Sequence, residues 1–209
     1  MVFVIDDDPL VRESIVDLVG SAHLPVLAFG STAEFMACAR PPVPACLILD
    51  VELPGLNGID FQSELRSTGV ELPIVFVTGH GDIPMSVKAM KAGALEFLTK
   101  PFRGPDLIQV VMQALEKDRD SIQRRSAMLD LRTRLESLTP RERQVLTLVV
   151  RGLLNKQIAG ELGTTELTVK AHRGKVMRKM RAASLADLVR MAERLQESTG
   201  ESSSSTKVQ

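Results

Sequence analysis

Five short apolar runs alternate with helix-forming segments in the first 118 residues, and this alternation constrains the fold more than any other feature. The runs lie at residues 2–5, 26–29, 45–49, 74–77 and 96–98, flanked by Gly, Pro or Asp. Short apolar strands of this kind are typical of a parallel sheet that is covered on both faces. Helical patterns are expected near residues 10–22, 33–39, 58–67, 84–92 and from 105 onward. The alternation predicts a doubly wound α/β domain with five parallel strands.

Side chains that can take part in phosphate or metal chemistry follow four of these expected strands. They are Asp6, Asp7 and Asp8 after the first, Asp50 after the third, Thr78 after the fourth and Lys100 after the fifth. Ligands bind beyond the carboxyl ends of parallel strands, so we expect these side chains to converge on one edge of the sheet. A single acidic residue in a loop would usually be solvated surface, but that reading does not account for four such strand ends.

This combination of residue types fits phosphoryl chemistry. Clustered carboxylates repel one another unless a cation neutralises them, and a site made only of oxygen ligands suits Mg²⁺. Such an ion offsets the charge of a phosphoryl group, and a carboxylate can act as the nucleophile that forms an aspartyl phosphate. Thr78 can donate a hydrogen bond to a phosphoryl oxygen, and Lys100 can form an ion pair with another.

Four stretches of the first half, at residues 5–8, 49–55, 77–81 and 100–102, resemble the motifs of the receiver domain of two-component response regulators. The resemblance extends over residues 1–118 and implies a flavodoxin-like fold. It implies that Asp50 accepts a phosphoryl group from a phosphohistidine of a sensor histidine kinase. It further implies that Asp7, Asp50 and the backbone carbonyl of Glu52 ligate Mg²⁺, with Asp6 acting through water.

The same resemblance gives roles to three further residues. Thr78 and Lys100 would be the pair that senses the phosphoryl group. Phe97, three residues before the lysine, occupies the place of the aromatic switch that rotates inward on activation. Composition alone would favour an ordinary core position for Phe97.

Charge is divided unequally between the two halves of the chain. Residues 1–118 carry 8 basic and 16 acidic side chains, a net charge of −8, whereas residues 119–209 carry 18 and 10, a net charge of +8. This division predicts two domains with different partners, the basic one suited to nucleic acid.

Several other classes of protein are disfavoured. No apolar stretch approaches the ~18 residues of a membrane helix, and no basic region precedes the first acidic residues as in a secretory signal. Cys38 and Cys46 provide neither a disulfide framework nor a zinc site, and buried thiols are the simpler reading. We therefore expect a cytoplasmic protein with no membrane partner.

The second half reads as a series of helices. A long helical stretch over 105–136 includes a heavily charged linker at 119–136, for which an irregular coiled coil is the alternative. Thr139, Pro140 and Glu142 form a strong helix start. Helices are expected from there to Arg151, over 156–162, from after 165 to 180, and from 184 to 195. Two short helices around a glycine turn, the second rich in cations, predict a helix-turn-helix.

This half resembles the helix-turn-helix of quorum regulators at residues 138–146, 155–159 and 168–173. Together with the receiver, it resembles the nitrogen-fixation J-type branch of response regulators. The resemblance implies that Lys170 and Ala171 approach base edges. It implies phosphate or supporting contacts for Lys156, Arg173, Lys175 and Lys179. Gly174 departs from many relatives, which carry a larger side chain within this helix.

The sequence thus predicts an α/β receiver at residues 1–118, a helical linker at 119–136, an all-α helix-turn-helix domain of four helices at 137–196 and a disordered tail at 197–209. The expected function is that of a response regulator, not an enzyme, in which phosphorylation of Asp50 promotes homodimerisation and binding to a double-stranded DNA operator. RNA polymerase is a further candidate partner.

The alternative is a Mg²⁺-dependent phosphatase of the dehalogenase type, which also combines aspartates, a Thr and a Lys on an α/β sheet. Such an enzyme needs its nucleophile in an Asp-x-Asp motif after the first strand and an acidic pair after the lysine. Here Pro101, Phe102, Arg103 and Gly104 follow the lysine instead.

Overall fold

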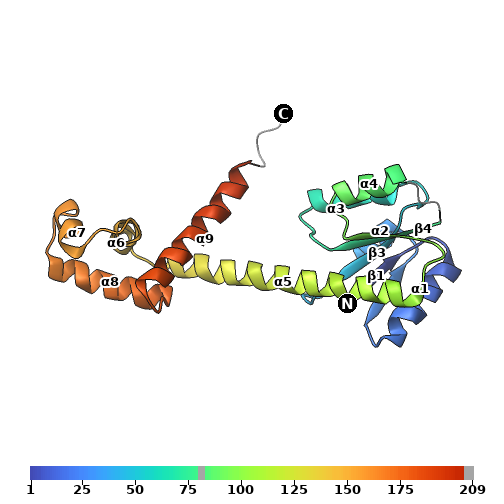
Figure 1. Cartoon of the computed structure of the whole chain (residues 1–209), viewed down its shortest axis with the longest axis horizontal. Coiled ribbons are helices and arrows are strands. Elements are labelled where there is room, and N and C mark those ends of the chain that lie inside the picture. The colour runs from blue at the N-terminus through green and yellow to red at the C-terminus, as the bar shows by residue number, and fades with distance from the viewer. Residues whose placement is uncertain (80–82, 205–209) are drawn as a thin grey trace. The chain divides into compact units, whose positions relative to one another are not determined.

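The computed structural model of the chain describes residues 1–79 and 83–204, with side chains described up to residue 197 (Figure 1). The chain divides into two compact units, Met1–Gln123 and Arg124–Gln209. Helix α5 (Gly104–Glu136) contributes residues to both units, which is why the boundary falls inside a helix.

The first unit contains the five-stranded parallel sheet that the sequence predicts. Its strands are β1 (Val2–Ile5), β2 (Val26–Phe29), β3 (Cys46–Asp50), β4 (Ile74–Thr78) and β5 (Glu96–Thr99), in the order β2-β1-β3-β4-β5. Its helices are α1 (Pro9–Ser21), α2 (Thr32–Ala37), α3 (Gly58–Ser67), α4 (Ile83–Lys91) and the first part of α5. Asp50 and Thr78 are the last residues of β3 and β4, so each of these strands ends one residue later than expected.

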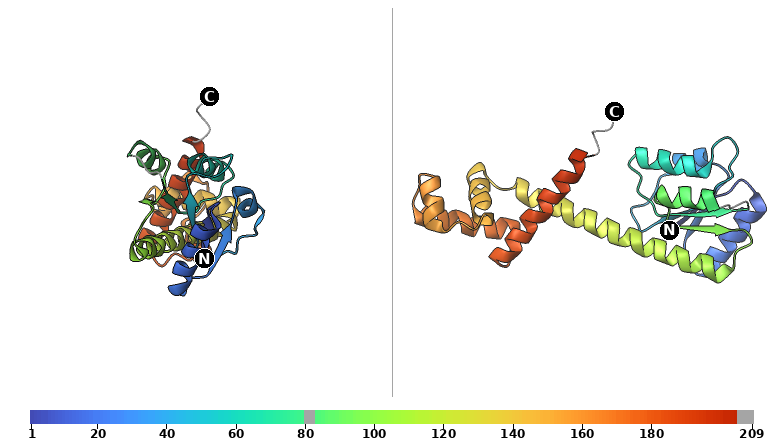
Figure 2. Two further views of the ribbon diagram at one scale, coloured as in Figure 1. Left: turned by 90° about the vertical axis from the view of Figure 1, so that its right-hand side faces the viewer. Right: turned by 45° about the horizontal axis from the view of Figure 1, so that its top comes forward.

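Alternate strand residues point to opposite faces of this sheet, and each face has its own apolar core. Phe3 and Ile5 of β1 pack in a cluster with residues of α2, α3 and α4, such as Phe35 and Phe61. Val2 and Val4 pack on the other face with residues of α1 and α5. Figures 1 and 2 show the sheet between these two helical layers. This burial on both faces accounts for the continuous apolar runs in the sequence.

The second unit is helical, as predicted. After the end of α5 come α6 (Pro140–Val150), α7 (Asn155–Glu161), α8 (Glu166–Met180) and α9 (Leu185–Ser204). The capping box at the start of α6 is present, since the Thr139 side chain accepts from the Glu142 amide and the Glu142 side chain accepts from the Thr139 amide. One apolar cluster contains buried residues from all of these helices, including Val145, Ile158, Val169 and Leu188.

The structure differs from the expected linker and tail. Leu131 of α5 is 4% exposed and belongs to the core of the second unit, with Met128 and Leu135 packed against that core. The end of the linker is therefore part of the helical domain, because its leucines recur at helical spacing and bury one face. Helix α9 continues to Ser204, past the expected end at Leu195 and into the expected disordered tail. Extending a formed helix by one residue is far easier than starting one, so polar residues can continue it.

Within residues 1–79 and 83–204, no helix combines the length and the apolar character that crossing a bilayer requires.

Candidate phosphorylation site and DNA-recognition helix

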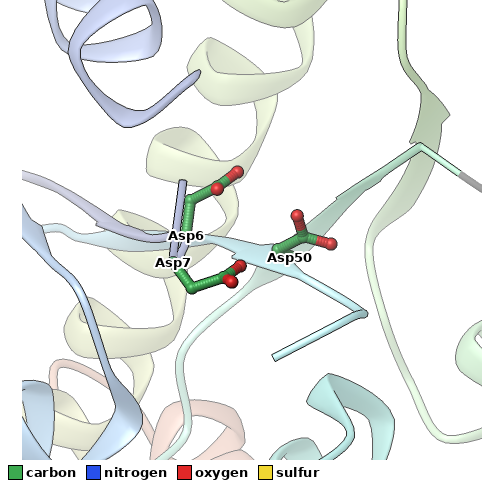
Figure 3. Close-up of side chains that lie close together, drawn as sticks. All are labelled: Asp6, Asp7 and Asp50. Carbon is green, nitrogen blue, oxygen red and sulfur yellow. The ribbon is translucent and has the colours of Figure 1, made fainter. Parts of the chain in front are cut away.

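Three carboxylates meet where β1 and β3 end. These strands are neighbours, with Ile5 paired to Leu49, so Asp6 and Asp7 leave the sheet beside Asp50. Each of the three offers an oxygen ligand, and these atoms all lie within 4.8 Å of one another (Figure 3). Asp6 is 1% exposed and Asp50 is 7% exposed, whereas Asp7 lies at the surface. The predicted convergence of the acidic residues is present in the structure.

Lys100 lies between the two buried carboxylates. Its Nζ is 2.7 Å from Asp50 Oδ2 and 2.8 Å from Asp6 Oδ2. Burial raises the pKa of Asp6, an effect that the hydrogen bond from Lys100 only partly offsets. Burial alone would lower the pKa of Lys100, but the hydrogen bonds and charges of Asp50 and Asp6 outweigh it, so this pKa lies above its usual value. Lys100 is thus held as a cation beside Asp50.

Backbone groups fix the orientation of these carboxylates. Asp6 Oδ1 accepts a hydrogen bond from the Asp8 amide at 3.0 Å, and Asp50 Oδ1 accepts one from the Glu52 amide at 3.0 Å. Arg12 of α1 donates to the Asp6 carbonyl at 2.7 Å. Asp8 is the N-cap of α1. Its side chain accepts hydrogen bonds from backbone amides of that helix and does not belong to the carboxylate cluster. These hydrogen bonds fix the Asp6 and Asp50 side chains relative to the ends of β1 and β3.

Gly58, which the sequence analysis did not single out, packs directly behind Asp50. A Cβ at this position would lie 2.3 Å from the Asp50 backbone oxygen, and the Gly58 amide donates to the Val51 carbonyl at 2.9 Å. Only glycine allows the start of α3 to approach the end of β3 so closely. The sequence signal for this role was a glycine at the first position of a helix, where glycine has no advantage for helix stability.

The remaining predicted residues of this site lie on β4, β5 and the loop after β3. Thr78 is fully buried at the end of β4, where it is the register partner of Thr99 in the neighbouring strand β5. Phe97 is half-buried and packs against the core, with its ring 6.3 Å from that of Phe76. Glu52 is exposed, and its backbone amide donates the hydrogen bond to Asp50 Oδ1 described above. The motif residues His80 and Gly81 lie outside the described part of the chain.

The carboxylates fit a divalent cation. Their donor set consists only of hard oxygen atoms, and the three negative charges exceed the single positive charge of Lys100. Mg²⁺ prefers such a set and binds through one or two carboxylates while keeping several waters. A receiver-type cluster of Asp6, Asp7 and Asp50 is therefore present, typical of a magnesium site.

The exposed face of α8 contains residues at helical spacing: Leu167, Lys170, Ala171, Gly174, Lys175 and Arg178. The opposite face holds Val169, Val176 and Met180, which are buried in the core. The predicted base-reading residues Lys170 and Ala171 thus lie on the solvent side, as does Lys156 near the start of α7. Arg178, for which the sequence predicts no DNA contact, lies on the same face.

Two of the predicted phosphate-contacting residues are engaged within the protein. Lys179 Nζ lies 2.7 Å from Glu142 Oε2 and donates to the Ser137 carbonyl at 2.9 Å. Arg173 donates to Asn155 Oδ1 at 2.8 Å and so connects α8 to the start of α7. The hydrogen bond from Lys179, with that from the Thr139 amide, lowers the pKa of Glu142 to about 2. Lys179 and Arg173 therefore connect α8 to α6, to the segment before it and to α7 within the helical unit.

Comparison with known protein families assigns both units. Residues 2–112 match the model of the response regulator receiver domain, and residues 136–192 match that of the bacterial regulatory proteins of the LuxR family. Nodulation protein W of Bradyrhizobium diazoefficiens is 51% identical over 195 residues, which make up 93% of this chain and 86% of that protein. The chain is a response regulator of the FixJ family.

Other members of the family share both units. The transcriptional regulatory protein FixJ of Azorhizobium caulinodans is 42% identical over 91% of this chain and 90% of its own length. The solved structure of the response regulator StyR is similar with a TM-score of 0.84, at 48% identity, over 92% of this chain and 98% of that chain. This FixJ-family regulator is thus a DNA-binding transcription regulator, not an enzyme, and the phosphatase alternative is set aside.

Proposed function

We propose that Asp50 of this regulator accepts a phosphoryl group from a sensor histidine kinase, with Mg²⁺ held by Asp7, Asp50 and the Glu52 carbonyl and by Asp6 through water. The observation that carries the proposal is the contact between Asp50 and Lys100 within a cluster of three carboxylates. Of the two carboxylates that Lys100 touches, Asp50 is the more exposed, so it is the one that an incoming phosphoryl group can reach.

The transfer itself needs little from the protein beyond position and charge. A carboxylate oxygen of Asp50 attacks the phosphorus atom, the phosphorus–nitrogen bond of the phosphohistidine breaks, and the imidazole leaves with the bonding electron pair. Lys100 then pairs with a phosphoryl oxygen, and the Thr78 hydroxyl donates to another. Bound Mg²⁺ would offset the negative charge that the phosphoryl group brings among the aspartates.

We further propose that phosphorylation draws Thr78 and Phe97 inward and remodels the face made by residues 83–106. Helix α4 presents Ile83, Val87 and Met90 at a spacing of one helical face, with exposed fractions of 80%, 45% and 43%. An apolar stripe of this kind supports docking of a second copy of the chain. A homodimer would place two recognition helices on one double-stranded operator.

In this proposal the exposed cations Lys156, Lys170 and Lys175 contact DNA, Ala171 faces the bases, and Arg173 and Lys179 support the helix. Regulation through RNA polymerase would follow binding. We infer a cytoplasmic location, where a bacterial regulator meets both its kinase and its DNA.

Incubation of the full chain with acetyl phosphate and Mg²⁺ tests the phosphoacceptor. Intact-mass measurement should show one added phosphoryl group in the wild type and none in Asp50→Asn. Asp60→Asn serves as the matched control, because Asp60 is an exposed aspartate of α3 paired with Lys88. Equal labelling of Asp50→Asn and the wild type would refute the proposal.

A further inference from the structure

The second residue of the recognition helix α8 is a large apolar side chain that the protein leaves in solvent. Leu167 is 78% exposed. Ala171 lies one turn further along the same face, and Lys170 lies beside both. The apolar core of the second unit contains Val169, Val176 and Met180 of this helix but not Leu167. Packing within the chain therefore does not explain the leucine.

Gly174, on the next turn of this face, also has no explanation within the fold. A Cβ added there would meet nothing within 4 Å, and the helical backbone at this position requires no glycine. Glycine weakens a helix interior, so its presence in the middle of α8 has a cost without a structural benefit. A glycine on an exposed helix face does lower the surface and allows another molecule to approach closely.

The charges around these residues indicate what approaches. Among the described residues, the cations of α8 fall into two groups. Arg173 and Lys179 are paired within the protein, and the others lie on the exposed face. The exposed group is Lys170, Lys175 and Arg178. In a helix-turn-helix the N-terminal residues of the recognition helix contact base edges in the major groove. Leu167, Lys170 and Ala171 occupy that part of α8, and Lys175 and Arg178 follow toward its C-terminal end.

We propose that Leu167 and Ala171 determine operator specificity by packing against thymine methyl groups in the major groove, and that Gly174 allows the close approach this packing needs. Thymine is the only base that presents a methyl group there, and apolar side chains are its natural partners. Lys170, between the two, is suited to the oxygen and nitrogen acceptors of guanine. The inference rests on the proposed base contacts of Lys170 and Ala171. It goes further by naming thymine as the base that the apolar side chains recognise.

The test begins with the tightest-binding duplex that the full-length, beryllofluoride-activated protein selects from a random library. Each thymine of that duplex is replaced in turn by deoxyuridine, which removes only the methyl group. Loss of one buried methyl contact should weaken wild-type binding about fourfold at one or more positions in each half-site. In Leu167→Ala the thymine and deoxyuridine duplexes should bind equally at the position that Leu167 reads.

Two further variants complete the test. Leu185→Ala, which removes an exposed leucine at the start of α9, should keep the full preference for thymine. Gly174→Leu should bind the selected duplex at least tenfold more weakly, because its side chain holds the helix away from the groove.

Salt-dependent DNA binding with equal affinity for every thymine and deoxyuridine duplex would overturn this inference but not the DNA-contact assignment of α8. Unchanged binding by Gly174→Leu would likewise overturn it. A different outcome would refute the proposed base contacts themselves. In that outcome Leu167→Ala, Ala171→Ser and Lys170→Ala would all still prefer the selected duplex over random DNA as strongly as the wild type does.

Discussion

Lys100 Nζ lies 2.7 Å from Asp50 Oδ2, so the proposed phosphoacceptor forms an ion pair with a cation of the protein itself. The same ammonium group contacts Asp6 at 2.8 Å. Lys100 and the proposed Mg²⁺ would thus act on the same carboxylates, and each would offset part of their mutual repulsion.

Lys100→Met should lower the free energy of unfolding by about 1.5–3 kcal/mol, the range for hydrogen bonds to charged groups. It leaves two buried carboxylates without their cation, so saturating Mg²⁺ should recover part of the loss. Urea unfolding followed by circular dichroism measures both effects. The absence of any magnesium-dependent recovery would argue against a cation site at these aspartates.

Asp7→Asn tests the magnesium ligands directly. Asp7 is the exposed member of the cluster, so its substitution removes a ligand without leaving an empty space in the core. Magnesium affinity should fall at least about tenfold, the lower limit for loss of even a supporting group at a metal site. Isothermal titration with Mg²⁺ gives the affinity, and Asp60→Asn is the control. A variant with wild-type affinity would exclude Asp7 as a ligand.

Gly58→Ala tests the packing behind Asp50. The added methyl group would lie 2.3 Å from the Asp50 carbonyl oxygen, so the end of β3 or the start of α3 has to move. We expect a loss of about 1–3 kcal/mol in stability, as for overpacking, together with slower phosphorylation by acetyl phosphate. Gly20→Ala is the matched control, because a Cβ there meets nothing within 4 Å, and alanine should stabilise α1 by up to about 1 kcal/mol. Phosphorylation of Gly58→Ala at the wild-type rate would contradict this role.

Glu142 should make the stability of the helical unit depend on pH. Its pKa of about 2 lies below the ordinary value of 4.5, so the ionised form stabilises the folded state. That contribution is complete above pH 4.5 and is lost as the pH falls toward 2. Glu142→Gln should be about 1–3 kcal/mol less stable than the wild type at pH 7, and the difference should shrink over this window. Urea unfolding at several pH values measures it, and a difference that is constant down to pH 2 would contradict the role of the Glu142–Lys179 pair.

The convergence of Asp6, Asp50 and Lys100 was predictable from the sequence because its signal is local. Apolar runs locate the strands; Asp6 and Lys100 directly follow β1 and β5, and Asp50 is the last residue of β3. A parallel sheet then brings these positions to one edge, whatever the details of packing. The receiver fold and the four helices after α5 were predictable for the same reason.

Pairing between distant side chains was not predictable in this way. Lys175 and Lys179 look alike in sequence, yet Lys179 meets Glu142, 37 residues away, and Lys175 lies on the exposed face. Nothing in the spacing of cations along α8 indicates which of them faces α6. Likewise, the charged sequence around Leu131 concealed that one side of α5 is buried in the helical unit.

The central claim is that phosphorylation of Asp50 controls DNA binding, and one measurement tests it most directly. Binding of the phosphorylated and unphosphorylated full-length protein to one operator is compared across protein concentration at fixed salt, with Asp50→Asn treated identically. We expect phosphorylation to raise DNA affinity together with dimer formation in ultracentrifugation, and Asp50→Asn to show neither change. Equal affinities for the two forms, with a phosphorylated protein that stays monomeric, would contradict the account.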